Sequence, residues 1–220
     1  VIGVPLAKLA MKVMAGRTLQ NLGFLEVPQC SHIAIKEAVF PFTKLGVSDV
    51  LLGPEMRSTG EVMGIDQSFG WAFAKSQAAT GLPIPLNGAA LLSVKDTDKP
   101  AALGIAQCLV SLGFSITATK GTASFLKEHG ITVQTVNKVN EGRPHIGDLI
   151  KNKDLAMVIN TVGDKTSQED SAPIRTAAVF GGIPYFTTMQ GAQAAVFGIE
   201  AMKKTALTVK SLQEYHRRPV

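Results

Sequence analysis

The chain has 220 residues, of which 45% are apolar and 6% aromatic, and its mean hydropathy is +0.19. This length and composition are typical of a globular α/β protein that buries one or two cores. The sequence contains no run of about 18 apolar residues that would span a membrane, and its start lacks the features of a signal peptide. We therefore expect a cytoplasmic protein with no membrane partner.

The net charge of +5 raises the question of a nucleic-acid partner, because clustered Lys and Arg bind phosphate backbones. Here the basic residues are scattered, with short groups only at 203–204 and 217–218. No aromatic residues alternate with them to stack on bases. We therefore expect no nucleic-acid partner.

The two cysteines, Cys30 and Cys108, lie far apart and lack metal-ligand spacing. Both are predicted to be reduced. Cys108 falls inside the apolar helical pattern of residues 103–110, which predicts that it lies in the core.

The first third of the chain predicts a small packing layer. Pro5 opens an amphipathic helix that Gly16 ends. Extended segments follow at 32–35, 38–42, 49–52 and 60–63, and a second helix spans 68–79. Residues 80–87 contain Gly and two prolines, which cannot continue a helix, so we place a domain boundary between residues 1–86 and 87–220.

The rest of the chain alternates strands with helices. Such alternation implies right-handed crossovers and a parallel sheet covered on both faces, here a five-stranded Rossmann-like fold. Residues 163–170 are polar and are predicted to form a surface loop. The predicted strands span 89–94, 115–118, 132–136, 155–160 and 183–186, and the predicted helices span 98–112, 122–129, 145–152, 170–180 and 192–202.

Ligands of open parallel sheets bind beyond the carboxyl ends of the strands, so polar residues at these ends are the candidate site. Thr119, Lys120, Gly121 and Thr122 follow one strand and open a helix. Hydroxyls, a glycine and the amides of a helix start are typical of a phosphate site. The alternative is an ordinary helix cap made by one of the two threonines.

Other strand ends supply further polar groups. Lys138 follows the third strand, and Asn160 and Thr161 follow the fourth. Ser93 ends the first strand and Lys99 begins its helix, so these residues form the rim. No catalytic residue and no metal site are predicted, because hydrolase and metal-binding motifs are missing and the histidines, at 32, 129, 145 and 216, are dispersed.

Two segments resemble the large subunits of carbamoyl-phosphate synthases. Residues 51–64, Leu-Leu-Gly-Pro-Glu-Met-Arg-Ser-Thr-Gly-Glu-Val-Met-Gly, resemble the end of the second ATP-grasp unit. Residues 137–146, Asn-Lys-Val-Asn-Glu-Gly-Arg-Pro-His-Ile, resemble part of the allosteric domain that follows it. The likeness runs over nearly the whole chain. It implies that residues 1–86 are an α+β ATP-grasp remnant and that residues 87–220 form a methylglyoxal-synthase-like allosteric domain.

The resemblance also implies a ligase. The family makes carbamoyl phosphate from bicarbonate, glutamine-derived ammonia and two ATP, for pyrimidine and arginine biosynthesis. ATP and Mg²⁺ or Mn²⁺ are then expected for upstream ATP-grasp regions of the same subunit, and a glutaminase small subunit is the expected partner. This segment itself is expected to be non-catalytic, to need no cofactor and to belong to an oligomer.

Bacterial members of this family bind nucleotide monophosphates such as UMP and IMP in the allosteric domain. By resemblance, the matching positions are Ser93, Lys99, Thr119, Thr122, Lys138, Asn160 and Thr161. The usual Asn-Thr-Thr reads Asn-Thr-Val at 160–162, which removes one hydroxyl. The sequence therefore leaves the identity of the effector open.

A family site for the activator ornithine is matched only in part. Glu37, Leu52 and Thr187 fit its pattern, but Phe186 stands where an aspartate is expected. Without that carboxylate an ammonium group loses its partner, so we expect ornithine to bind weakly or not at all.

Two other functions compete with an effector-binding module. Methylglyoxal synthase shares the predicted fold, but its Gly-Gly-Asp-Gln segment reads Glu-Gly-Arg-Pro-His at 141–145, which removes the catalytic aspartate. A purely structural cap that mediates oligomer contacts would bind no effector.

Overall fold

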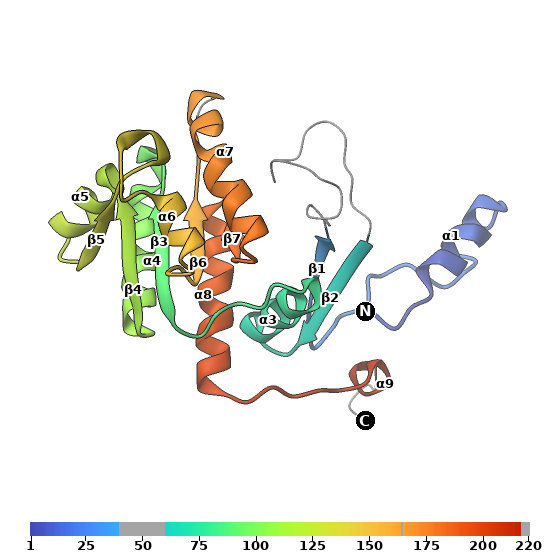
Figure 1. Cartoon of the computed structure of the whole chain (residues 1–220). Coiled ribbons are helices and arrows are strands. Elements are labelled where there is room, and N and C mark those ends of the chain that lie inside the picture. The colour runs from blue at the N-terminus through green and yellow to red at the C-terminus, as the bar shows by residue number, and fades with distance from the viewer. Residues whose placement is uncertain (40–59, 164, 217–220) are drawn as a thin grey trace.

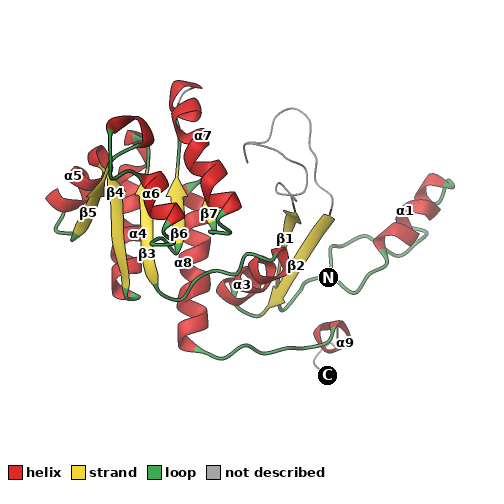
Figure 2. Ribbon diagram, viewed as in Figure 1, coloured by secondary structure: helices red, strands yellow, loops and turns green. Residues whose placement is uncertain are grey.

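The structure, a computed structural model, describes residues 1–39, 60–163 and 165–216 (Figure 1). It has a small N-terminal layer of strands and helices, followed by a five-stranded sheet with helices on both faces (Figure 2). The predicted five-stranded parallel α/β fold is confirmed. Among the described residues, no helix is both long and apolar enough to cross a membrane.

The five strands are parallel and lie in the order β5-β4-β3-β6-β7. β3 (Gly88–Ser93) is central and pairs with β4 (Phe114–Thr119) and β6 (Met157–Asn160), while β5 (Val133–Val136) and β7 (Tyr185–Phe186) are at the edges. The chain moves from β3 to one edge and then returns to build the other. The strand order therefore reverses between β3 and β6, where open α/β sheets bind their ligands.

Helices cover both faces of this sheet, as nearly continuous apolar strands require. α4 (Lys99–Ser111), α5 (Lys120–Glu128) and α8 (Met189–Lys204) supply the larger apolar cluster on one face. α6 (Ile146–Lys151) and α7 (Lys165–Phe180) supply the smaller cluster on the other.

The start of α7 corrects one prediction. Residues 163–170 are predicted to form a surface loop, but the helix already begins at Lys165. This stretch lacks the apolar periodicity by which helices are predicted. Its Lys, Gln and Glu nevertheless have good helix propensity, so the helix extends backwards from its apolar half.

Cys108 corrects another prediction. It is exposed, whereas the buried positions of α4 are Ala102, Ile105, Ala106 and Leu109. Those four residues follow the spacing of a single helix face, and Cys108 lies beside that face. Both cysteines are free thiols, as predicted.

The N-terminal layer joins two antiparallel strands to a helix. β1 (Ile33–Val39) pairs with β2 (Gly60–Asp66), and α3 (Phe69–Thr80) packs on both. The Ser68 hydroxyl caps α3 by accepting a hydrogen bond from the Trp71 amide at 3.2 Å. The predicted strand at 49–52 and the end of the one at 38–42 lie outside the described residues. The predicted first helix is confirmed as α1 (Leu6–Met14), which buries none of its residues.

The two parts of the chain meet where α3 packs against α8. Gly70 of α3 faces α8 so closely that a methyl group there would overlap the carbonyl oxygen of Phe197 and lie 2.9 Å from the Ala201 Cβ. A methyl group on Gly198 would lie 3.6 Å from the Gly70 carbonyl oxygen of α3 and 2.6 Å from the Cδ1 of Ile84, which follows α3. Each helix therefore has a glycine where the other approaches, and the backbones come close because no side chain separates them.

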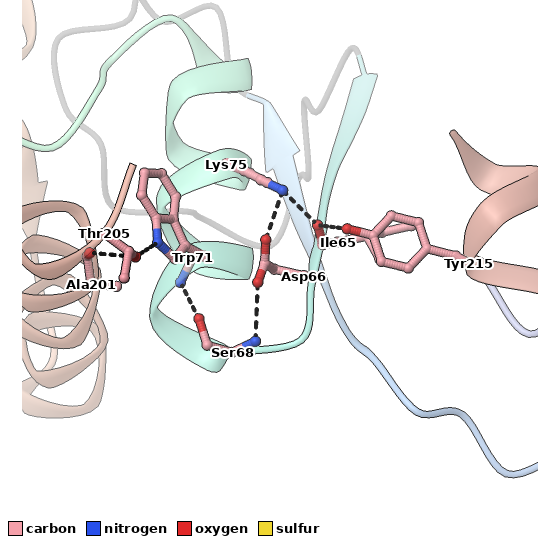
Figure 3. A network of polar contacts seen from close by, with 8 residues as sticks. All are labelled: Ile65, Asp66, Ser68, Trp71, Lys75, Ala201, Thr205 and Tyr215. Carbon is pink, nitrogen blue, oxygen red and sulfur yellow. Dashed lines mark hydrogen bonds and ion pairs between the residues drawn. The ribbon is translucent and has the colours of Figure 1, made fainter. Parts of the chain in front are cut away.

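A polar network reinforces this contact (Figure 3). The Trp71 indole donates a hydrogen bond to the Thr205 hydroxyl at 2.7 Å, and this hydroxyl donates to the Ala201 carbonyl at 3.2 Å. α3 is thereby tied to the C-terminal end of α8.

The chain after α8 runs back to the N-terminal layer (Figure 1). There Tyr215 of α9 (Leu212–His216) donates its hydroxyl to the Ile65 carbonyl at 3.1 Å, and Lys75 donates to the same oxygen at 3.2 Å. Lys75 also lies 2.8 Å from the Asp66 carboxylate. Burial raises the pKa of Asp66, but hydrogen bonds from Lys75 and the Ser68 amide outweigh it and hold the pKa below its usual range.

The α3–α8 contact predicts a specific cost for a single methyl group. Gly70→Ala should lower the free energy of unfolding by about 1–3 kcal/mol, because the helices must move apart to admit the Cβ. Gly104→Ala is the matched control: Gly104 is also inside a helix, but a Cβ there meets no atom within 4 Å. It should raise the stability by up to about 1 kcal/mol. Urea unfolding of both variants measures the difference, and equal effects would contradict the close approach.

Candidate functional site

The polar residues predicted at the strand ends come together along one edge of the sheet. Ser93 of β3 is in register with Asn160 of β6. On the other side, Leu92 is in register with Ala118, so Thr119 lies beside Ser93. Thr119 is in turn paired with Val136 of β5, two residues before Lys138.

Hydrogen bonds from both neighbouring strands converge on Ser93. Its carbonyl oxygen accepts from the Asn160 side-chain amide at 2.9 Å and from the Thr161 backbone amide at 3.1 Å. Its hydroxyl accepts from the Thr119 hydroxyl at 3.3 Å. All four residues are buried, so the end of β3 is held from both sides by groups shielded from water.

Two threonines hold the loop that follows β3. The Thr122 hydroxyl accepts from the Val94 amide at 3.2 Å, and the Thr161 hydroxyl accepts from the Lys95 amide at 3.2 Å. Both threonines are buried. These hydroxyls therefore fix the backbone that leads from β3 into α4.

The start of α5 is available to an anion. Thr119 is the N-cap residue, but its side chain makes no capping hydrogen bond. Since the Thr122 hydroxyl bonds to residue 94, the alternative of an ordinary threonine cap is wrong. The first amides of α5 are donors that carry a partial positive charge, and the helix offers them at the strand ends.

Lys99 adds a full positive charge at the same place. Its Nζ would lie 3.7 Å from a Cβ built on Gly121, in the first turn of α5. The ammonium group pairs with Asp96 at 2.8 Å, and this hydrogen bond lowers the pKa of the Asp96 carboxyl group. A side chain at position 121 would stand next to this ammonium group, so glycine keeps the space open.

The other two predicted cations lie further out. Lys120 and Lys138 are both exposed, and Lys120 pairs with Glu141 at 3.5 Å. The Glu141 carboxylate also accepts from the Lys138 backbone amide at 3.3 Å. Glu141 thus links the start of α5 to the segment that follows β5, a role that the sequence prediction missed.

The comparisons with known proteins agree with this architecture. Residues 101–187, which include most of the sheet and the predicted site, match the family model of the MGS-like domain. The chain contains an MGS-like domain.

Beyond this domain, nearly the whole chain is similar to carbamoyl phosphate synthase large chains, as predicted. It is 48% identical to those of Myxococcus xanthus and Nostoc sp. over 97% of this chain, and 44% identical to one of Methanosarcina barkeri over 98% of it. The matched region is 20%, 19% and 54% of these proteins, so the chain spans about a fifth to a half of their length. The crystal structure of ForH shares 19% identity over 52% of this chain and 79% of that chain, with a TM-score of 0.40.

Of the residues that match the ornithine pattern, Glu37 lies apart from the strand-end site, whereas Thr187 follows β7 at the same edge of the sheet, next to Asn160 in the register of β6 and β7. Glu37 is in β1, where the Ser76 hydroxyl lies 3.1 Å from its carboxylate and the Gln77 amide donates to it. Thr187 is exposed just after β7 of the MGS-like domain, and Phe186 is buried in the larger apolar cluster. Leu52 lies outside the described residues. Weak ornithine binding stays a prediction.

No group of three or more metal-ligating side chains occurs in the part of the chain that the structure describes. His145, at the start of α6, has a local structural role: its backbone amide donates to the Asp148 carboxylate at 3.1 Å. This bond and the neighbouring Arg143 hold the pKa of Asp148 below its usual range.

Glu37 should make the stability of the chain depend on pH. Burial raises the pKa of Glu37, and hydrogen bonds from Ser76 and Gln77 offset only part of this effect. The folded state therefore keeps this proton to a higher pH than the unfolded state does. The resulting stabilisation is complete below the unfolded-state pKa of about 4.3 and is lost as the pH rises through the folded-state pKa.

Glu37→Gln cannot ionise, so its stability relative to the unmodified chain should increase as the pH rises from about 4 to about 7. Urea unfolding across this range measures the difference. Glu61→Gln, which changes an exposed carboxylate on the neighbouring strand, is the control for the loss of a charge. A difference that stays constant with pH for Glu37→Gln would contradict the prediction.

Proposed function

We propose that the chain is the C-terminal regulatory segment of a carbamoyl phosphate synthase large chain, and that its MGS-like domain binds a phosphorylated effector such as UMP or IMP. The observation that carries this proposal is the start of α5, which has no side-chain cap and lies beside the Lys99 ammonium group. Free amides at a helix start and an adjacent cation are the features that bind phosphate.

The residues around this point suggest how the effector is held. The phosphate group accepts from the first amides of α5 and from Lys99, and the exposed Lys138 closes over it from the neighbouring loop. Asn160 contributes a polar hydrogen from its strand end, and Thr119 supports this end because its hydroxyl donates to Ser93. Thr122 and Thr161 act through the backbone that they fix, because their hydroxyls bond to the loop after β3.

For the whole large chain we propose the activity of the family that the sequence resembles. The ligase makes carbamoyl phosphate from bicarbonate, ammonia released from glutamine by a small subunit, and two ATP, and it supplies pyrimidine and arginine biosynthesis in the cytoplasm. In this proposal ATP and Mg²⁺ or Mn²⁺ bind to upstream ATP-grasp regions. The present segment regulates the reaction within an oligomer and does not catalyse it.

A lyase of the methylglyoxal synthase type is less well supported. That chemistry needs a carboxylate base with a pKa near the working pH. Of the two carboxylates in the loop that follows β5 and in α6, Glu141 is paired with Lys120, and the pKa of Asp148 is lowered. The lowered pKa makes Asp148 a poorer proton acceptor, and Glu141 is already engaged in an ion pair.

Titration calorimetry tests the proposed binding directly. The chain should bind UMP or IMP with a Kd in the micromolar to millimolar range. Uridine should bind far more weakly, because it lacks the phosphate that the α5 amides and the lysines recognise. The same chain should form no carbamoyl phosphate from ATP, bicarbonate and ammonia. If no purine or pyrimidine monophosphate gives a heat of binding, the proposed effector binding is contradicted. If the chain forms carbamoyl phosphate, the proposal that it is regulatory and not catalytic is contradicted.

Single substitutions locate the phosphate. Lys138→Ala should weaken UMP binding by about 10- to 150-fold, as expected for a charge-assisted contact. Thr119→Val removes a neutral hydroxyl and should cost about 1 kcal/mol of binding free energy. Lys127→Ala is the control, because Lys127 bonds to Thr135 on the outer side of α5 and β5 and should not affect affinity. Unchanged affinity in Lys138→Ala would reject this placement.

A further inference from the structure

The Asn160 side chain has a second hydrogen-bond partner that the sequence did not identify. The Tyr185 hydroxyl lies 2.6 Å from the Asn160 Oδ1. The register of β6 and β7 explains this contact. Tyr185 is opposite Val158, and in a strand the side chains of residues 158 and 160 point to the same face. Tyr185 therefore reaches diagonally along β6 to the last residue of that strand.

The bonds on the two ends of the Asn160 amide determine its orientation. A carbonyl oxygen only accepts, so the atom 2.9 Å from the Ser93 carbonyl must be the amide nitrogen. The amide oxygen then faces Tyr185, whose hydroxyl must donate to it. The amide is fixed at both ends, and at 3% exposure it is shielded from competing water.

This orientation decides what the strand end offers to a ligand. The Asn160 oxygen faces Tyr185 and accepts its hydrogen, whereas the nitrogen at the other end of the amide carries two hydrogens and uses one for Ser93. The second hydrogen is left for a ligand. We infer that Tyr185 is a positioning residue that covers the Asn160 oxygen and leaves an N–H for the ligand, which makes the site selective for anions. This inference rests on the proposed function, since it assigns a specificity determinant to the same site.

Phe186 and Tyr185 have different roles although they are adjacent. Tyr185 packs against the apolar cluster formed with α6 and α7, and Phe186 belongs to the cluster on the opposite face. The tyrosine hydroxyl therefore lies on the face of Asn160, and the phenylalanine ring does not.

A double-mutant cycle measured with UMP tests the inference. Tyr185→Phe should weaken UMP binding by about 2- to 12-fold, the range for one neutral hydrogen bond. In the Asn160→Ala background the same change should have no effect, because the group that Tyr185 positions is gone. If Tyr185 had only a structural role, Tyr185→Phe would weaken UMP binding equally in the unmodified chain and in the Asn160→Ala variant. That result would overturn the inference.

Tyr215→Phe is the matched control. It removes the hydroxyl of the only other tyrosine in the sequence, which bonds to Ile65 in the N-terminal layer, and UMP affinity should not change.

Asn160→Asp replaces the N–H with an oxygen, so it should weaken UMP binding more than Asn160→Ala does. Equal or tighter binding by Asn160→Asp would overturn the inference. Melting temperatures confirm that each variant is folded. If the unmodified chain binds no UMP, the proposed function itself is contradicted. If the chain binds UMP and Tyr185→Phe leaves the affinity unchanged, only the inference about Tyr185 is contradicted.

Discussion

The hydrogen bonds to Ser93 are the constraint on which the candidate site depends. β3 is the central strand, and its last carbonyl accepts two hydrogen bonds from the end of β6. A buried carbonyl without partners would cost about 1–3 kcal/mol, so the strands must keep the register that supplies these donors. The same register places Thr119 of β4 against the Ser93 hydroxyl. The strand ends are therefore aligned by their own hydrogen bonds, before any ligand is considered.

This arrangement separates residues that bind from residues that support. The hydroxyls of Thr122 and Thr161 hold the backbone after β3. Their loss would disturb the loop that leads to Lys99, even if neither touches a ligand. Donors with capacity left for an anion are the first amides of α5, the lysines and one N–H of Asn160. A family pattern read residue by residue does not make this distinction, since both kinds of residue appear in it as matching polar positions.

The sequence predicted the parts of the fold that have a periodic signal. The alternation of apolar strands with helices predicted the parallel sheet. Because the strands of such a sheet end at one edge, it also predicted that Ser93, Thr119 and Asn160 come together there. Features that depend on contacts across the fold were missed. Tyr185 was read only as part of a strand, because its bond to Asn160 depends on the pairing of β7 with β6. Cys108 was misplaced because a one-residue shift on a helix turns a side chain from the core toward solvent.

The contact between the two parts of the chain was also invisible in the sequence. Glycine within a helix normally weakens the helix, so Gly70 and Gly198 look unfavourable when α3 and α8 are considered separately. Packed together, they let the two backbones approach until a methyl group at Gly70 would overlap the Phe197 carbonyl. Such a contact cannot slide by small steps, because close-packed interiors have no free volume to absorb a shift. α8 begins directly after β7, the strand that carries Tyr185. α8 therefore connects β7, whose Tyr185 positions Asn160, with α3, which packs on β1 and β2. Its packing against α3 holds the MGS-like domain and the N-terminal layer together.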